Sequence, residues 1–252
     1  MKPAIGPQTA SFKVAGRSIQ ENLDRAVAEG RIVVESDGRY RLAPSSSRDL
    51  LTNDTPTLTN HGTSAPPCQF LNDFLFGGAY GGAQVPHGCR ACYKILVWPN
   101  DLRGLMALKR LFEPVPRPTK VRNEALDART PNTYLGVVYA DGLAMARQLH
   151  REIRAAIDAD PALGTGIRME IRRGCTNYER SCGPSDRYSF DPALEKIEQE
   201  LASLYRAPPP PLHPQGKRDA AALLRLIQIA FQLGDETYRD LTGGKALRSE
   251  ER

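Results

Sequence analysis

Hydrophobic and polar positions between residues 93 and 172 follow two different periods. Residues 93–98 and 134–139 are almost continuously apolar, which is typical of strands buried on both faces. Residues 119–125 are mostly polar and residues 167–172 alternate, as expected of strands with one solvated face. Residues 101–112 and 141–159 carry apolar side chains on a helical stripe. The order of predicted elements is therefore strand, helix, strand, strand, helix, strand.

This β-α-β-β-α-β order predicts an α+β fold with a ferredoxin-like core. In that topology the first and third strands are central, and here these are the two apolar ones. The first and fourth strands are antiparallel neighbours, so the start of residues 93–98 should lie beside the end of residues 167–172. Asn100 is the expected cap of the first helix.

The first 43 residues predict a separate helix and hairpin. Ser18 can cap a helix that runs to about Glu29, and Gly30 ends it. Residues 31–35 and 39–42 flank Ser36-Asp37-Gly38, a turn typical of β-hairpins. A helix followed by a hairpin resembles the last third of a winged helix, although the helices that usually precede it are missing. The simpler interpretation is a packing appendage.

The remaining segments complete a five-part division of the chain. Residues 44–67 are rich in Ser, Thr, Asn and Pro and predict a linker, followed by an α/β core at 68–190. Within it, residues 76–82 form a Gly-rich stretch that lacks the Lys-Ser/Thr ending of a P-loop, so we expect a hinge or close-approach loop. Helices are predicted at 192–205 and 217–241 within a C-terminal region at 191–244, and residues 245–252 form a mobile tail.

Composition and charge narrow the function only slightly. No apolar run approaches the ~18–20 residues needed to span a membrane, and the N-terminus lacks the apolar stretch of a secretory signal, so we expect a cytoplasmic protein with no membrane partner. The net charge of +5 permits contact with nucleic acid without requiring it. The broad apolar face of the last helix could pack on the domain, on a second copy of the chain or on a partner protein.

Four of the five cysteines lie at the two strand ends that the topology brings together. Cys89-Arg90-Ala91-Cys92 precedes the first strand, and this spacing allows both thiolates to bind one ion. Cys175 follows the fourth strand, and we expect Cys182 a short loop later. The sequence therefore predicts a metal centre held by Cys89, Cys92, Cys175 and Cys182, with Cys68 as the substitute ligand.

Three other interpretations of the cysteines are less consistent with the sequence. A thioredoxin-type redox pair normally begins a helix, whereas this pair precedes a strand. Scattered inert cysteines are less consistent with thiols flanked by glycine in loops. A structural disulfide is disfavoured in a reducing compartment.

The cysteines alone do not identify the metal. Four thiolates suit either structural zinc or an iron–sulfur cluster of the [4Fe–4S] or [2Fe–2S] type. The seven-residue step from Cys175 to Cys182 exceeds the spacing of a usual zinc knuckle, and the fifth thiol favours a cluster. The cations Arg90, Lys94, Arg173 and Arg180 could offset the negative charge of either cofactor. His87 and His61 are the substitute ligands of imidazole type.

Three functions remain on these grounds. The first is an iron–sulfur protein with an electron-transfer, redox-sensing or cofactor-assembly role. The second is a zinc-stabilised nucleic-acid-binding or regulatory protein that uses the N-terminal helix and hairpin and the Arg-rich loops. The third is a metal-dependent enzyme, which requires an open coordination position. The sequence contains neither a Gly-x-Ser-x-Gly elbow nor a His-Glu-x-x-His motif.

Overall fold

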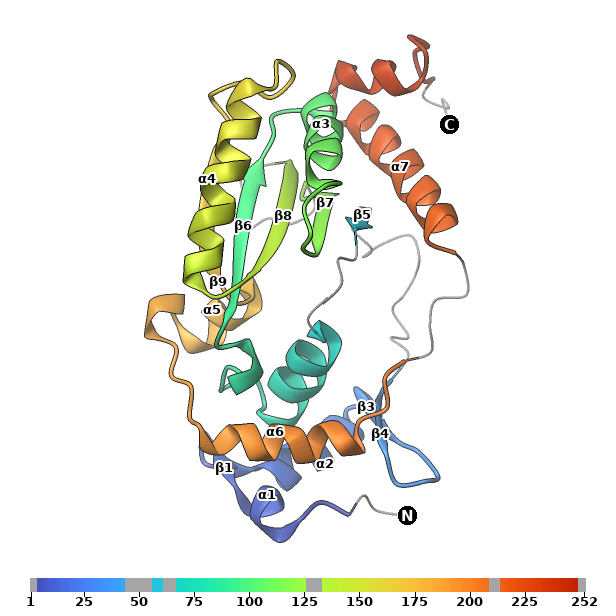
Figure 1. The fold of residues 1–252 in the computed structure, drawn as a ribbon. Coiled ribbons are helices and arrows are strands. Elements are labelled where there is room, and N and C mark those ends of the chain that lie inside the picture. The colour runs from blue at the N-terminus through green and yellow to red at the C-terminus, as the bar shows by residue number, and fades with distance from the viewer. Residues whose placement is uncertain (1–3, 44–55, 61–66, 126–132, 209–213, 249–252) are drawn as a thin grey trace. The chain divides into compact units, whose positions relative to one another are not determined.

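The computed structural model describes residues 4–43, 56–60, 67–125, 133–208 and 214–248 (Figure 1). It combines helices with a five-stranded antiparallel sheet and confirms the α+β class. The chain forms two compact units. The first comprises Met1–Asn53, Pro66–Cys92 and Arg173–Pro210, and the second comprises Asp54–Ala65, Tyr93–Arg172 and Pro211–Arg252.

This division differs from the predicted one. The predicted core at 68–190 is shared between the two units, so that all five cysteines belong to the first unit and the sheet belongs almost entirely to the second. The two predicted C-terminal helices also separate, because 193–204 belongs to the first unit and 215–232 to the second. Each unit has its own apolar core.

The sheet of the second unit has the strand order β5-β7-β8-β6-β9. Its strands and helices are β5 Thr57–Asn60, β6 Cys92–Trp98, α3 Leu102–Phe112, β7 Thr119–Asn123, β8 Tyr134–Asp141, α4 Leu143–Ala159 and β9 Arg168–Arg173. The pairs β5–β7 and β7–β8 are antiparallel, with Val121 opposite Leu58 on one side and Gly136 on the other. All six predicted elements are present, and β5 lies within the segment that had been predicted to be a linker.

Alternating side chains bury both faces of the central strands. Ile95 and Val97 of β6 join the core that α3 and α4 cover, and Leu96 and Trp98 join a smaller apolar cluster with residues of β8. Figure 1 shows α3 and α4 against this sheet. Burial on both faces explains why β6 reads as a continuous apolar run. The first helix is capped by Asp101 and not by the expected Asn100, since the Asp101 Oδ1 accepts a hydrogen bond from the Gly104 N–H at 2.7 Å.

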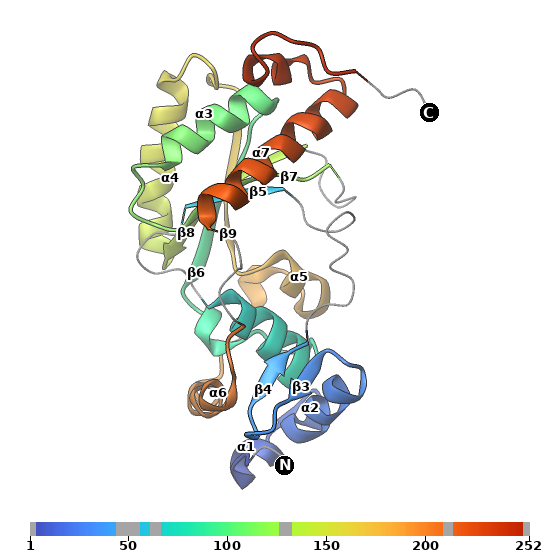
Figure 2. The same cartoon turned by 90° about the vertical axis from the view of Figure 1, so that its right-hand side faces the viewer.

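The C-terminal part of the second unit is α7 Gln215–Gln232 followed by the 3-10 helix η4 Glu236–Leu241. The buried residues Leu226, Ile227 and Ala230 place the apolar stripe of α7 in the core, and Figure 2 shows α7 alongside β5. The predicted single helix is therefore broken before η4. Leu224 stays exposed on α7, so a partner for this helix remains a prediction.

The first unit contains the predicted N-terminal helix and hairpin. Its elements are α1 Pro7–Ser11, β1 Lys13–Val14, β2 Arg17–Ser18, α2 Ile19–Ala28, β3 Ile32–Val34, β4 Tyr40–Leu42, a π-helix η1 Gln69–Ala79, the 3-10 turn η2 His87–Cys89, α5 Thr176–Cys182, the 3-10 turn η3 Ser185–Arg187 and α6 Ala193–Leu204. Ser18 caps α2 as predicted, and Glu21 completes a capping box with it. β3 and β4 pair around a turn in which Gly38 has a φ of 77°.

The π-helix η1 replaces the predicted Gly-rich hinge. Its wide turns are closed by a hydrogen bond from the Tyr80 N–H to the Leu75 carbonyl, five residues back, at 2.8 Å. Gly78 allows η1 to approach the N-terminal hairpin, because a Cβ at this position would lie 2.7 Å from the Ile32 Cδ1. The glycines thus serve a close helix contact. π-helical turns are rare and often accompany functional sites.

Candidate metal centre

The Cys89-x2-Cys92 pair lies where the first unit leads into β6. Cys89 ends the η2 turn and is buried, and Cys92 is the first residue of β6. The turn is closed by a hydrogen bond from the Arg90 N–H to the His87 carbonyl at 2.9 Å. The pair is therefore held on a short and well-connected turn.

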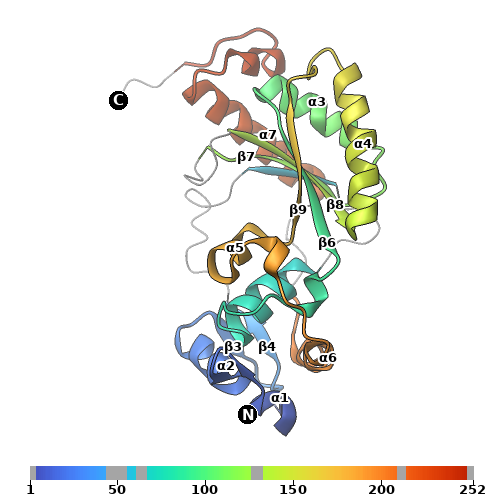
Figure 3. The same cartoon turned by 90° about the vertical axis from the view of Figure 1, so that its left-hand side faces the viewer.

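Hydrogen bonds to backbone carbonyls connect the segment that precedes Cys175 to this turn. The Gly174 N–H donates to the Cys92 carbonyl at 2.9 Å, and the Arg173 Nη2 donates to the Arg90 carbonyl at 2.7 Å. Figure 3 shows β9 beside β6, with α5 following β9 in the chain. Segments that are about 80 residues apart in the sequence thus meet as the topology predicted.

A buried phenol marks the centre of the cysteine group. The Tyr178 Oη and the Cys89 Sγ are 3.4 Å apart, and either atom can donate the proton. Burial raises the pKa of Cys89 to about 12, although the hydrogen bond with Tyr178 lowers this pKa. Negative charge on Cys92, Cys175 or Cys68 would raise it further. Burial also raises the pKa of Tyr178, as does charge on Cys89, Cys175 and Cys68. Cys68, Cys89, Cys92 and Cys175 are thus close enough to interact electrostatically.

Cys182 is separated from this group. The expected loop between Cys175 and Cys182 is the helix α5, which Cys175 precedes and Cys182 ends. Seven helical residues rise about 10 Å, so the two thiols lie at opposite ends of α5. The Cys182 Sγ lies 4.0 Å from the Gly82 carbonyl, and its pKa is raised by burial alone, with no contribution from another cysteine. The electrostatics thus favour Cys68 over Cys182 as the fourth member of the group, whereas Cys182 packs against the same apolar core as Cys89, Cys92 and Cys175.

The grouped thiols are near one another without being in coordinating positions. Within the described ranges, no three Cys, His, Asp or Glu side chains are placed so that they could hold one metal ion. All five cysteines are free thiols. Metal binding would therefore require the sulfur atoms to move closer together as their protons are released.

A buried carboxylate holds the turn that carries Cys89. Glu198 of α6 accepts hydrogen bonds from the His87 N–H at 2.6 Å, the Gly88 N–H at 2.8 Å and the Tyr80 hydroxyl at 2.9 Å. The absence of a side chain at Gly88 permits close packing here, because a Cβ would lie 2.8 Å from the Leu71 Cδ2 and 3.3 Å from the Glu198 Oε2. Three donors satisfy a carboxylate that would otherwise be costly to bury.

The four cations predicted near the site lie in different surroundings. Arg90 and Arg173 belong to the cysteine-bearing segments, and the Arg173 guanidinium also lies 4.3 Å from the ring centroid of Phe190. Arg180 is exposed on α5. Lys94 belongs to the second unit, where its Nζ lies 5.4 Å from the Tyr139 ring centroid.

Of the two substitute histidines, the structure describes only His87. It is buried, and its Nδ1 lies 3.4 Å from the Arg90 Nη1. His61 lies outside the described residues.

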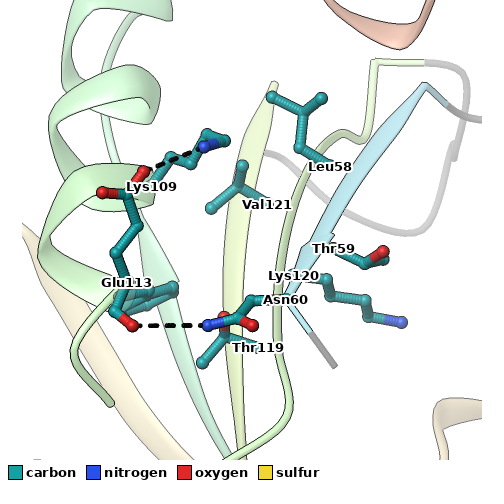
Figure 4. A pocket seen from close by; sticks show the side chains of 9 residues that line it. Leu58, Thr59, Asn60, Lys109, Glu113, Thr119, Lys120 and Val121 are labelled. Carbon is teal, nitrogen blue, oxygen red and sulfur yellow. Dashed lines mark hydrogen bonds and ion pairs between the residues drawn. The ribbon is translucent and has the colours of Figure 1, made fainter. Parts of the chain in front are cut away.

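A shallow pocket in the second unit offers no comparable chemistry. Figure 4 shows Lys109 paired with Glu113 and the Asn60 side chain bonded to the Glu113 carbonyl beside β5 and β7. None of the predicted site residues lines it. We therefore assign no function to this pocket.

Two residues of the candidate site were not found from the sequence. Tyr178 lies in a polar segment between Cys175 and Cys182, and Glu198 lies in a helix among other acidic residues. The sole signal for Glu198 was its place on the apolar stripe of α6, between Leu194 and Leu201. A carboxylate on such a stripe indicates a buried polar partner.

Comparison with known proteins adds no family to this picture. No protein-family model, curated protein or solved structure matches the chain. In the part of the chain that the structure describes, no helix has both the length and the apolar character to cross a membrane.

Proposed function

We propose that this protein binds a cysteine-ligated metal centre, with an iron–sulfur cluster as the cofactor and electron transfer, redox sensing or cofactor assembly as its role. The observation that carries the proposal is that Cys89 and Cys92 come from a segment about 80 residues before Cys175, and a backbone hydrogen bond from the Gly174 N–H to the Cys92 carbonyl joins the two segments. Negative charge on Cys68 or Cys175 would also raise the pKa of Cys89 and of Tyr178, whose hydroxyl lies 3.4 Å from the Cys89 Sγ. Scattered inert cysteines would have no reason to converge in this way. Thiolates are the usual ligands of such clusters.

The surroundings of these thiols support the cluster. Cys89 lies in an apolar core together with Phe76 and Tyr178, whose ring centroids are 4.5 Å apart. Apolar burial and a hydrogen bond to a ligand sulfur are two of the factors that set the potential of a cluster. Arg90 and Arg173 supply positive charge on the same segments. We also propose a cytoplasmic location, since a reducing compartment keeps free thiols available.

The fold proposal concerns the second unit. We propose that β6-α3-β7-β8-α4-β9 is a ferredoxin-like arrangement extended by β5 at the edge next to β7. The strand order β7-β8-β6-β9 supports it. This topology carries no function by itself, and its role here is to bring the start of β6 beside the end of β9.

The alternative is a zinc-stabilised nucleic-acid-binding or regulatory protein. Cations lie over the aromatic rings of one sheet face, with Lys94 and Lys120 over Tyr139 and Arg168 over Trp98. Basic side chains among aromatic rings suit contact with single-stranded nucleic acid. A metal-dependent enzyme would need one of the four grouped cysteines to be dispensable for metal binding.

Spectroscopy with metal analysis of anaerobically purified protein tests the proposal. A cluster gives a brown protein with broad absorbance near ~400 nm and stoichiometric iron and sulfide. A colourless protein with one zinc ion per chain would support the zinc alternative instead of the cluster. Absence of both metals after reconstitution with iron and sulfide or with zinc would reject the metal centre.

A further inference from the structure

We propose that Glu198 is a positioning residue that fixes the backbone of the turn from which Cys89 and Cys92 would reach a metal. This inference rests on the proposed metal centre and adds to it a residue that touches no metal. Glu198 acts on the backbone immediately before Cys89, where its two oxygens accept from the amides of His87 and Gly88.

Burial makes the hydrogen bonds of Glu198 costly to lose. Glu198 is 7% exposed, so water cannot readily replace the donors that it binds. A carboxylate accepts only, whereas a glutamine side chain would turn one NH2 group toward an N–H donor. Glu198→Gln therefore breaks part of the clamp on the η2 turn while preserving the size of the side chain.

The same helix offers a matched control. Glu200 also accepts from a backbone amide, that of Gly6 at 2.5 Å, and from the Thr9 hydroxyl at 2.5 Å. Both partners belong to the N-terminal segment and not to the cysteine-bearing turn. Glu200→Gln thus repeats the chemical change on α6 without disturbing the Cys89–Cys92 turn.

The test titrates Zn²⁺ into metal-free full-length protein against a chromophoric chelator. We expect Glu198→Gln to bind Zn²⁺ about 10- to 100-fold more weakly than wild type, the usual cost of losing an outer-shell partner, and Glu200→Gln to bind it normally. Equal affinity of Glu198→Gln and wild type would overturn the inference. An equal loss in Glu200→Gln would overturn it as well, because the effect would then be general destabilisation.

A second readout does not depend on metal. Alkylation of Cys89 in the metal-free protein, followed by mass spectrometry, should be faster in Glu198→Gln than in wild type and unchanged in Glu200→Gln. If wild type binds no Zn²⁺, the metal proposal fails, and unchanged Cys89 reactivity would reject the role of Glu198 separately. Should Glu198→Gln not fold, Tyr80→Phe removes one donor to Glu198 and should shift both readouts in the same direction by less, and no shift would reject the role.

Discussion

Replacement of Cys68 by serine is expected to abolish metal binding, whereas Cys182→Ser should retain the full wild-type complement. Negative charge on Cys68 would raise the pKa of Cys89 and of Tyr178, while Cys182 lies at the far end of α5 from Cys175. Because four thiolates complete a closed site, losing one costs a large share of a binding free energy that is on the order of 10–16 kcal/mol for structural zinc. Cys89→Ser, Cys92→Ser and Cys175→Ser should behave like Cys68→Ser.

Metal content per folded chain, determined after anaerobic reconstitution, checks this expectation. Cys182→Ser is the matched control, since it makes the same change at a half-buried cysteine of the same unit. If Cys182→Ser loses the metal and Cys68→Ser keeps it, the ligand set is the one expected from the sequence. If each single variant keeps the metal, the cysteines do not form one site.

Asp235→Asn is expected to lower the free energy of unfolding of the second unit by about 2–4 kcal/mol, because charged hydrogen bonds are among the strongest. The Asp235 Oδ2 accepts from the Leu102 N–H at 2.8 Å and the Tyr134 hydroxyl at 2.6 Å, while Oδ1 accepts from the N–H and hydroxyl of Thr237. An asparagine presents an NH2 group to one of these donor pairs however its amide is turned. The carboxylate joins α3, β8 and η4.

The effect should depend on pH. Partial burial opposes the charge on Asp235, but hydrogen bonds from Thr237, Tyr134 and Leu102 outweigh it and lower the pKa of Asp235 below its ordinary value. A lowered folded-state pKa gives stability that is fully present above about pH 4, the ordinary range of Asp, and that is lost as pH falls through the folded-state pKa. The difference between wild type and Asp235→Asn should therefore shrink in acid.

The fluorescence of Trp98, the sole tryptophan of the chain and a buried residue of the second unit, reports this unfolding in denaturant. Asp240→Asn is the control, because Asp240 pairs with Arg103 at an exposed position, where an ion pair contributes little to stability. Equal losses in the two variants, or a difference from wild type that grows in acid, would contradict the role assigned to Asp235.

The elements predicted best from the sequence are those in which burial of one face gives a regular spacing of apolar residues. The apolar strands β6 and β8 and the striped helices α3 and α4 were found because each covers or crosses one core. The capped helix α2 and the hairpin after it were found because Ser18 and Asp37-Gly38 are local signals. The predicted strand order in turn placed the Cys89–Cys92 turn beside Cys175.

Elements formed by non-local contacts were missed. β5 is a short run in which only Leu58 is apolar, and it forms a strand by pairing with β7. The end of the π-helix η1 was predicted to be a hinge or a close-approach loop because glycines are poor helix formers, and Gly78 does permit a close approach to Ile32. No local sequence pattern reveals that β5 pairs with β7 or that η1 packs against Ile32.

The fourth ligand that we propose differs from the one predicted from the sequence for a similar reason. The segment between Cys175 and Cys182 lacks an apolar stripe and was taken for a loop, yet it forms α5. A loop would have allowed both thiols to reach one site, and the helix separates them. Cys68 joins the group because η1, which it precedes, packs within the core that contains Cys89.

Protection of individual cysteines in the metal-loaded protein tests the central claim most directly. Loaded and metal-free samples are alkylated in parallel, and each cysteine peptide is quantified by mass spectrometry. We expect Cys68, Cys89, Cys92 and Cys175 to react more slowly when metal is bound, and Cys182 to react at the same rate in both samples. Protection of Cys182 together with an unprotected Cys68, or equal reactivity of all five cysteines with and without metal, would contradict the proposed centre.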